Sequence, residues 1–274
     1  MKLLVTDIDE TLSRGESLTW EVAEGCRRLR ESGWRMMIAT GRILATALPH
    51  IKGTGSDLPA IVYDGGRIMD PMSGQVLYEV PMAPPLALEI LRSGWEHPVE
   101  LQVIGNERAA CRPGDVRTRN FFTSVGVPVD SSLSEPAIPD EVFRVIFYGA
   151  PQDIRKLQGQ LKARFSGRVE VVQAGSGFLD VLPLGVSKGT ALRAWLSMLP
   201  ERPEIIVAAG DHHNDLEMLA AADLAVVPED GAEDVLRAAD IIMPSPDRHG
   251  FAALAALLLR EDLPGSNTTR PVVL

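Results

Sequence analysis

The sequence has few cysteines and no long apolar run. Its 274 residues include only Cys26 and Cys111, which excludes a framework of several disulfides and leaves open one disulfide or a reduced pair. No apolar stretch approaches the roughly 18 residues that a helix needs to span a bilayer. Residues 1–6 are too short to be a signal peptide before Asp7 interrupts them. We therefore expect a cytoplasmic protein that is not inserted in a membrane.

Positive charge is also scarce. The chain has 27 Lys and Arg residues against 37 Asp and Glu residues, a formal net charge of -10, and no basic run. Proteins that bind the nucleic-acid backbone carry basic runs or patches, so we expect no nucleic-acid partner. The same charge makes the chain a poor general attractant for phosphates. A phosphate site must therefore be positive locally, through a metal ion, through Lys188, or through helix N-termini.

Three apolar runs in the sequence end abruptly in polar residues. The runs cover residues 2–6, 35–39 and 205–209, and a helical pattern follows each of them. Strands that alternate with helices predict a parallel sheet, and open sheets of this class bind ligands beyond the carboxyl ends of their strands. We therefore expect these polar residues to converge on one site. They are Asp7 and Asp9 after the first run, Thr40, Gly41 and Arg42 after the second, and Gly210 to Asp215 after the third.

Paired carboxylates follow the first and the third run. Asp7 and Asp9 are spaced i, i+2, so they point the same way if the chain stays extended. Asp211 and Asp215 are spaced i, i+4 and share a face if a helix begins there. Crowded carboxylates repel each other, and a divalent cation offsets that repulsion. Two plainer interpretations stay open: the first pair belongs to an ordinary turn, and Asp215 caps a helix over residues 216–222.

The chain divides into a core and an inserted segment. Residues 2–39 predict a strand–helix–strand unit, and interleaved helices and strands return after the insertion. Pro81 to Pro85 interrupts this pattern, and the alternating strands that follow predict a sheet with helices on one face and solvent or a cleft on the other. Residues after about 262 predict a frayed tail. The predicted class is α/β, with a Rossmann-like parallel-sheet core formed by residues 1–81 and 184–274 and an inserted α+β domain formed by residues 82–183.

Four motifs occur in a familiar order: Asp7-Ile8-Asp9-Glu10-Thr11, Thr40-Gly41-Arg42, Ser187-Lys188-Gly189 and Gly210-Asp211-His212-His213-Asn214-Asp215. Together they resemble the haloacid dehalogenase superfamily of phosphatases, of the Cof-like sugar-phosphatase type with a C2B-like cap. The resemblance spans most of the chain and implies that the inserted domain is a cap that closes over the active site and sets substrate specificity. The sequence departs from the family pattern at three places: Glu10 stands where Gly is usual, Tyr63 to Gly66 replace a more usual Asn-Gly-Ala, and residues 225–231 lack the usual Met-Gly-Asn.

The resemblance also assigns catalytic roles. It makes Asp7 the nucleophile that forms an aspartyl-phosphate. It makes Asp9 the group that protonates the leaving alcohol and later activates water. The Mg²⁺ ligands that it implies are Asp7, Asp9 through its backbone carbonyl, Asp211 and Asp215.

The phosphate-binding residues are expected at the second motif and at the start of a helix. The hydroxyl of Thr40 and the N–H groups near Gly41 are placed to bind a phosphoryl oxygen. Lys188 lies at the expected N-terminus of a helix, where its charge would neutralise the phosphate and Asp7. Arg42 either holds phosphate or substrate or pairs with a carboxylate at the surface.

The third strand end carries two further polar candidates. Asn214 is expected to orient Asp215 or another acid and to contribute to substrate binding. His212 and His213 are not predicted to bind zinc, because adjacent residues do not face each other and no third His or Cys lies at ligand spacing.

The function that these residues predict is Mg²⁺-dependent hydrolysis of a phosphate monoester. The expected partner is a small phosphorylated metabolite, such as a sugar phosphate or a phosphoglycerate-type ester, bound by a monomer or a homodimer. Two alternatives stay open. The aspartyl-phosphate could pass to a sugar hydroxyl, as in a phosphomutase or phosphotransferase, or the pocket could bind a phosphometabolite as a sensor without turnover.

Overall fold

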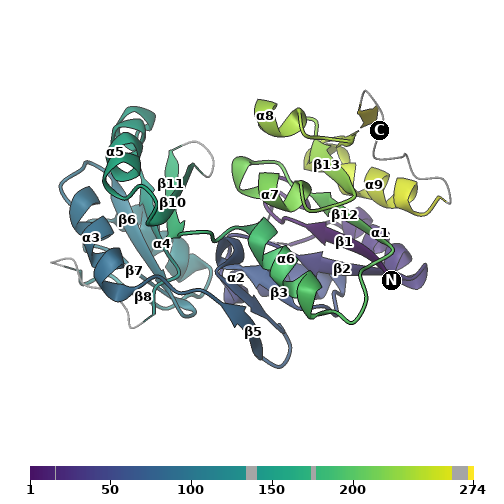
Figure 1. The fold of residues 1–274 in the computed structure, drawn as a ribbon, viewed down its shortest axis with the longest axis horizontal. Helices are drawn as coiled ribbons and strands as arrows, with labels where there is room; N and C mark the ends of the chain where they lie inside the picture. Colours follow the sequence, from purple (N-terminus) through teal and green to yellow (C-terminus); the bar gives the residue numbers. More distant parts are fainter. Residues whose placement is uncertain (16, 134–140, 174–176, 261–270) are drawn as a thin grey trace. The chain divides into compact units, whose positions relative to one another are not determined.

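The structure is a computed structural model that describes residues 1–15, 17–133, 141–173, 177–260 and 271–274. The chain forms two compact units, one of Met1–Tyr78 with Ser187–Leu274 and one of Glu79–Val186 (Figure 1). The domain boundaries expected from the sequence stay a prediction. The role of the second unit as a cap stays a prediction.

The first unit contains a six-stranded sheet in which all neighbouring strands run parallel, in the order β15-β14-β13-β12-β1-β2. The central strands are apolar and buried, as expected for a sheet covered on both faces. Thr6 pairs with Ala209, so the chain leaves β1 and β12 at neighbouring points of the same sheet edge. The strands are β1 (Lys2–Thr6), β2 (Trp34–Ile38), β12 (Ile205–Ala209), β13 (Leu224–Pro228), β14 (Ile241–Met243) and β15 (Val272–Val273).

Helices α6 and α7 pack on this sheet. Leu192 of α6 and Met218 of α7 belong to the same buried cluster as Leu3 and Val5 of β1. Helix α6 begins with a capping box, in which the Ser187 hydroxyl accepts the N–H of the third helical residue. The helices of this unit are α1 (Trp20–Glu31), α2 (Leu44–Thr54), α6 (Lys188–Met198), α7 (Leu216–Leu219), α8 (Glu233–Leu236) and α9 (Gly250–Leu258).

A second, three-stranded sheet lies beside the end of β2. It has the order β3-β4-β5, with β3 at Ala60–Val62, β4 at Arg67–Met69 and β5 at Val76–Glu79. A bridge between Ala39 and Ile61 joins it to the chain that leaves β2. The hairpin turn expected between β4 and β5 is present.

Two segments of this unit differ from the sequence-based expectation. The tail expected after about residue 262 falls mostly outside the described residues, but Val272–Val273 form β15 and pair with β14 instead of fraying. The helices expected over residues 214–222 and 232–239 are short, since α7 and α8 have four residues each. Tertiary contacts, rather than helical length, therefore hold these segments.

The second unit is an α+β domain. Its sheet has the order β10-β11-β9-β6-β7-β8, with all neighbours antiparallel except β7 and β8. Side chains of β6 and β9, such as Leu101 and Phe147, pack against Ile90 of α3 and Leu157 of α5. The elements are α3 (Pro84–Gly94), β6 (Glu100–Gly105), β7 (Arg108–Ala110), α4 (Val116–Ser124), β8 (Val129–Asp130), β9 (Arg144–Tyr148), α5 (Pro151–Arg164), β10 (Val169–Gln173) and β11 (Phe178–Pro183).

The second face of this sheet is partly covered, because α4 packs against it at β6. Gln102 alternates with Leu101 and Val103, so its side chain points to the face opposite the cluster formed with α3 and α5. There its amide donates to the hydroxyl of Thr118 in α4, at 3.2 Å. The expectation of helices on one face only was therefore wrong at β6.

Two further observations concern the expected setting of the protein. No helix among the described residues is both long enough and apolar enough to cross a bilayer. Cys26 and Cys111 are both buried and free. Of the two alternatives that the sequence left open for the cysteines, the structure has the reduced pair.

Candidate active site

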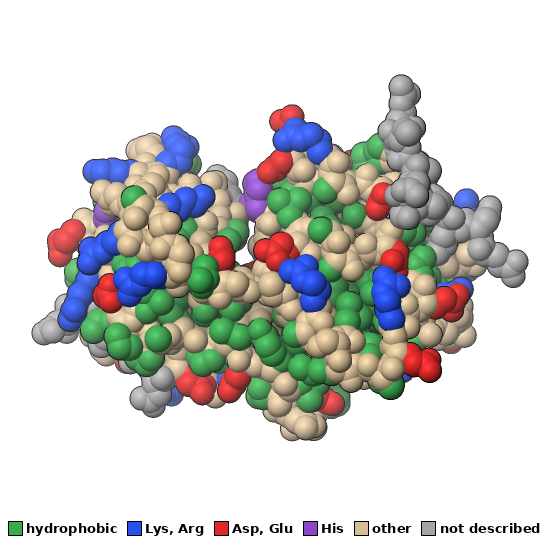
Figure 2. All heavy atoms as spheres, viewed as in Figure 1, with side chains coloured by type: hydrophobic (Ala, Val, Ile, Leu, Met, Phe, Trp, Pro, Cys, Tyr) green, Lys and Arg blue, Asp and Glu red, His purple; other side chains and the backbone are tan. Residues whose placement is uncertain are grey.

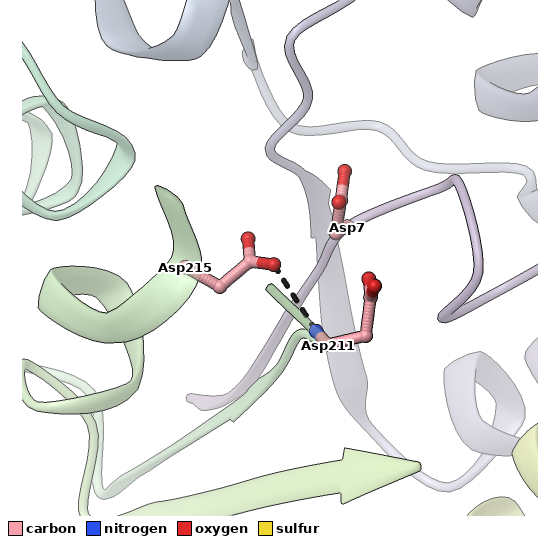
Figure 3. A group of neighbouring side chains, drawn as sticks. All are labelled: Asp7, Asp211 and Asp215. Atoms are coloured by element: carbon pink, nitrogen blue, oxygen red, sulfur yellow. Dashed lines mark hydrogen bonds between the residues drawn. The ribbon is translucent and has the colours of Figure 1, made fainter. Parts of the chain in front are cut away.

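Three carboxylates from distant parts of the chain meet at the carboxyl edge of the parallel sheet. Asp7 follows β1 directly, and Asp211 follows β12 after one glycine. Asp215 ends the short 3-10 helix η2 (His213–Asp215). One oxygen from each of the three lies within 4.8 Å of the others. Figure 3 shows the three side chains close to one another. The parallel pairing of β1 with β12 brings the first two together across some two hundred positions of sequence.

Lys188, the first residue of α6, is buried among these acids. Its ammonium lies 2.9 Å from Oδ2 of Asp7 and 2.7 Å from Oδ1 of Asp215, and the lysine is fully buried. The carboxylates raise the pKa of Lys188 although burial acts against them, so the side chain stays charged. Gly189 permits this placement of α6, because a Cβ there would lie 2.4 Å from the backbone of Glu217.

Asp215 is held in place by the loop that precedes it. Its Oδ2 accepts the backbone N–H groups of Asp211 and His212, each at 3.1 Å, and the first of these bonds is drawn in Figure 3. Its side chain does not cap α7. The alternative interpretation of Asp215 as a helix cap was therefore wrong, because the carboxylate turns inward to Lys188.

Asp7 combines a backbone contact with the ion pair. Its Oδ1 accepts the N–H of Ile8 at 2.7 Å. Burial raises the pKa of Asp7 well above its ordinary value; Lys188 opposes this effect, and the carboxylates of Asp215 and Asp211 add to it. Burial and the neighbouring carboxylates thus make the charged form of Asp7 less favourable than it is in water.

The pKa of Asp211 is also raised. Burial, and then the carboxylate of Asp215, raise its pKa from 3.8 to about 7, while a hydrogen bond from Thr11 lowers it. The Thr11 hydroxyl donates to Oδ1 of Asp211 at 2.8 Å. Sequence reasoning gave Thr11 no role, although it belongs to the first motif.

Asp9 does not join the three carboxylates. The chain leaves the extended conformation after β1, and the N–H groups of Leu12 and Ser13 both donate to the carbonyl of Ile8. The condition for Asp7 and Asp9 to point the same way, an extended chain, is therefore not met. Its carboxylate accepts two bonds from Arg42, at 2.9 and 2.6 Å. Coordination of a cation through its backbone carbonyl stays a prediction.

Arg42 thus pairs with a carboxylate, one of the two roles that the sequence left open. Its third nitrogen donates to the carbonyl of Thr46 at 3.1 Å. The Thr40 hydroxyl accepts the backbone N–H of Arg42 at 3.1 Å, so the second motif forms a tight turn around Gly41. Thr40 is fully buried at the sheet edge.

Asn214 orients an acid other than Asp215. Its amide donates to Oδ1 of Asp64 at 2.9 Å, and Asp64 is 2% exposed. Asp64 has a φ of 55°, between Tyr63 at 54° and Gly65 at 100°. At Gly65 a Cβ would lie 2.1 Å from the carbonyl oxygen of Ser187, so this turn requires glycine to approach α6. Asp64 and Gly65 both belong to the segment Tyr63 to Gly66, which stands where the family pattern usually has Asn-Gly-Ala.

His212 and His213 form a chain of contacts that leads to Asp234. Nε2 of His213 lies 2.7 Å from Asp234, and its Nδ1 lies 3.3 Å from Nδ1 of His212. Burial lowers the pKa of His212. Among the described residues the group that could hold a metal ion consists of Asp7, Asp211 and Asp215. That the histidines are not zinc ligands stays a prediction.

The three acids suit a hard divalent cation. Mg²⁺ prefers oxygen ligands and takes one or a few carboxylates while keeping bound waters. Burial, and after it the repulsion between carboxylates, raises the pKa values of Asp7 and Asp211. In ionised form the three acids exceed the ammonium of Lys188 by two negative charges. A divalent cation would balance this excess.

The chain resembles known proteins in both sequence and fold. Residues 4–254 match the sequence model of a family described as haloacid dehalogenase-like hydrolase. The chain is 27% identical over 224 residues to the HMP-PP phosphatase of Klebsiella pneumoniae (strain 342), covering 80% of this chain and 81% of that protein. The fold is similar to that of a haloacid dehalogenase-like hydrolase from Bacteroides thetaiotaomicron, with a TM-score of 0.81, 22% identity, and coverage of 93% of this chain and 98% of that one.

A further relative is much longer than this chain. The chloroplastic endoribonuclease YBEY of Arabidopsis thaliana is 29% identical over 259 residues, which cover 90% of this chain and 44% of that protein. The chain therefore spans less than half the length of that relative. The similarities confirm the fold class predicted from the sequence, an α/β core with an inserted α+β domain.

Proposed function

The chain belongs to the haloacid dehalogenase-like hydrolase family, and from this premise we propose that it hydrolyses phosphate monoesters of small metabolites through a covalent intermediate on Asp7. The observation that carries the proposal is the contact of Asp7 with Lys188 inside the group of three carboxylates. A carboxylate held in this way is a nucleophile for phosphorus.

The proposed reaction has two steps. In the first, an oxygen of Asp7 attacks phosphorus, the bond from phosphorus to the ester oxygen breaks, and Asp9 gives its proton to the leaving oxygen. In the second, water attacks phosphorus and loses a proton to Asp9, the bond from phosphorus to Asp7 breaks, and inorganic phosphate leaves. Asp9 lies on the turn directly after the nucleophile, which supports its role as the proton carrier.

Lys188 and the second motif are proposed to bind the phosphoryl group. Lys188 keeps Asp7 oriented and, within the described part of the chain, is the only ammonium that pairs with these acids, so it offsets the negative charge that phosphate adds. Thr40 and Gly41 lie at the end of the strand next to β1 and offer N–H and hydroxyl groups to phosphoryl oxygens.

The proposed cofactor is Mg²⁺, held by Asp7, Asp211 and Asp215. When bound it would neutralise the carboxylates and the phosphoryl oxygens, which is the chemistry that transfer of a phosphoryl group needs. Thr11 and the loop N–H groups keep Asp211 and Asp215 in position for it.

The proposed substrate class is a small phosphorylated metabolite, such as a sugar phosphate or a phosphoglycerate-type ester. The 27% identity to an HMP-PP phosphatase supports a small organic phosphate, and the inserted α+β unit is the proposed specificity-setting cap. On the displayed face of the first unit, basic side chains lie next to acidic ones, which gives no support to a nucleic-acid partner (Figure 2). The free cysteines support the proposed cytoplasmic setting.

The test is release of inorganic phosphate from a panel of phosphorylated sugars and glycolytic intermediates, with an aryl phosphate as a general probe. We expect turnover with Mg²⁺, loss with EDTA, and loss in Asp7→Asn. An isomeric ester in place of free phosphate would identify a mutase instead. Binding of the esters without release of phosphate would identify a sensor and overturn the proposal.

A further inference from the structure

Arg14 ties together loops that follow three different strands of the parallel sheet. Its guanidinium donates to Glu10, at 2.5 Å, to Asp230 and to Asp247. Glu10 lies in the turn after β1, Asp230 in the loop after β13, and Asp247 in the 3-10 helix η3 (Pro246–Arg248) after β14.

The turn that Arg14 holds is the one that carries Asp9. Glu10 follows Asp9 directly and has a φ of 58°, a left-handed conformation that a residue with a Cβ adopts at a cost. The N–H of Glu10 donates to the carbonyl of Ser13, which closes the turn. A strained turn keeps one conformation only where surrounding contacts hold it, and Arg14 supplies contacts from outside the turn.

The opposite side of the same turn is held by the carboxylate cluster. The Thr11 hydroxyl donates to Asp211, so this turn is braced by Thr11 on one side and by Arg14 on the other. An exposed ion pair by itself stabilises a fold only weakly. The significance of Arg14 therefore lies in what it positions rather than in global stability.

We propose that Arg14 is a positioning residue that holds the Ile8–Ser13 turn, and with it Asp9, at the distance from Asp7 that proton transfer to the leaving group requires. This inference rests on the proposed function. A displacement of about 1 Å at a reacting group can cost up to about 100-fold in rate, so a brace at this turn has a measurable effect. Asp7, Asp215 and Lys188 are held by other contacts and should keep their places without Arg14.

The neighbouring Arg248 provides a matched control. It pairs with Glu229 at 2.7 Å and so joins the loop after β13 to η3, the same two loops that Arg14 reaches, without touching the turn that carries Asp9. Arg248→Ala removes an exposed arginine and an ion pair from the same surface. It should leave turnover unchanged if only the brace on Asp9 matters.

The experiment compares Arg14→Ala with Arg248→Ala on two esters, p-nitrophenyl phosphate and the alkyl phosphate of the panel that the wild type hydrolyses fastest. An alkyl leaving group needs the proton from Asp9 far more than nitrophenolate does. We expect Arg14→Ala to lower kcat on the alkyl ester by about tenfold or more and on the aryl ester by less than about threefold, with KM unchanged. Equal losses on both esters, or equal losses in the two arginine variants, would overturn the proposal.

A second variant and a second measurement keep the test independent of folding and of activity. Asp230→Asn with Asp247→Asn removes the distant anchors and should reproduce the loss of Arg14→Ala, and the combination of all three changes should add little to it. Hydrogen exchange should be faster over residues 8–14 in Arg14→Ala and unchanged in Arg248→Ala. If the wild type released no phosphate from either ester, the proposed function would fail, whereas unchanged exchange over residues 8–14 would refute the brace itself.

Discussion

The ammonium of Lys188 lies 2.7 Å from a carboxylate oxygen of Asp215, and neither side chain is exposed to solvent. The two residues are separated by 27 positions and are brought together by the packing of α6 against the loop after β12. The same ammonium contacts Asp7. A single buried cation therefore holds the proposed nucleophile and one proposed metal ligand in fixed relation.

Replacing Lys188 by Met should be strongly destabilising. The change leaves two buried carboxylates without their counter-ion, and breaking one side of a buried ion pair costs about 3–5 kcal/mol in free energy of unfolding. Urea-induced unfolding at neutral pH in EDTA measures this. Lys52→Met, which changes an exposed lysine of α2, is the control and should leave the unfolding midpoint unchanged. Similar midpoints for the two variants would contradict the buried ion pair.

Gly210→Ala should displace Asp215. A Cβ at Gly210 would lie 2.4 Å from the Cβ of Asp215 and 2.8 Å from its Oδ2, so one of the two must move. We expect a loss of about 1–3 kcal/mol in stability from overpacking, together with weaker Mg²⁺ binding. Calorimetric titration with Mg²⁺ checks the second effect. Gly159→Ala adds the same methyl group where nothing lies within 4 Å and should leave Mg²⁺ affinity as it is.

Mg²⁺ binding should strengthen as the pH rises through about 7. The pKa of Asp211 is raised from 3.8 to about 7, and only its carboxylate form binds a cation. Because the folded pKa is the higher one, the metal-free fold holds a proton that the unfolded chain releases. This contribution to stability is complete below the unfolded pKa and is lost as the pH rises through the folded pKa, and the raised pKa of Asp7 acts in the same direction.

The measurement for this pH dependence is the rise in Tm on adding Mg²⁺, at about pH 6 and about pH 8. We expect the larger rise at the higher pH, and a flatter dependence in Asp211→Asn. A larger rise at the lower pH would show that Asp211 is ionised throughout this range and that the assigned pKa shift is wrong.

Thr11→Val should weaken Mg²⁺ binding at neutral pH by a few-fold. The Thr11 hydroxyl donates to Asp211 and lowers its pKa, so its removal favours the protonated acid that does not bind the cation. Titration with Mg²⁺ at two pH values checks this, since the difference from wild type should shrink at high pH. Thr54→Val is the matched control, because the Thr54 hydroxyl donates to the carbonyl of Ile51 inside α2.

Much of the fold was accessible from the order of apolar runs. Residues 2–6, 35–39 and 205–209 form β1, β2 and β12 at or within one residue of the expected bounds, because buried parallel strands consist of short continuous apolar runs. The domain boundary expected at the break from Pro81 to Pro85 stays a prediction. The chain end was predicted wrongly, since Val272 and Val273 join the sheet through backbone bonds that composition does not reveal.

Parts of the site depended on contacts that no local pattern contains. Asp9 turns to Arg42, Asp215 turns to Lys188 instead of capping α7, and Asn214 meets Asp64. In each case the direction of the side chain is set by a partner residue from another segment of the chain. The alternation of side chains along a strand predicts a direction only while the strand continues, and β1 stops at Thr6.

The sequence by itself determined which residue types follow the strands, and hence that carboxylates, a lysine and small polar groups gather at one edge of a parallel sheet. Only the tertiary structure decided which of them touch, because the strand order places β12 beside β1 and the turns set the direction of each side chain. Short-range patterns report backbone conformation and burial. Pairing between charged groups depends on distances of a few ångströms between distant loops, and these distances exist only in the folded chain.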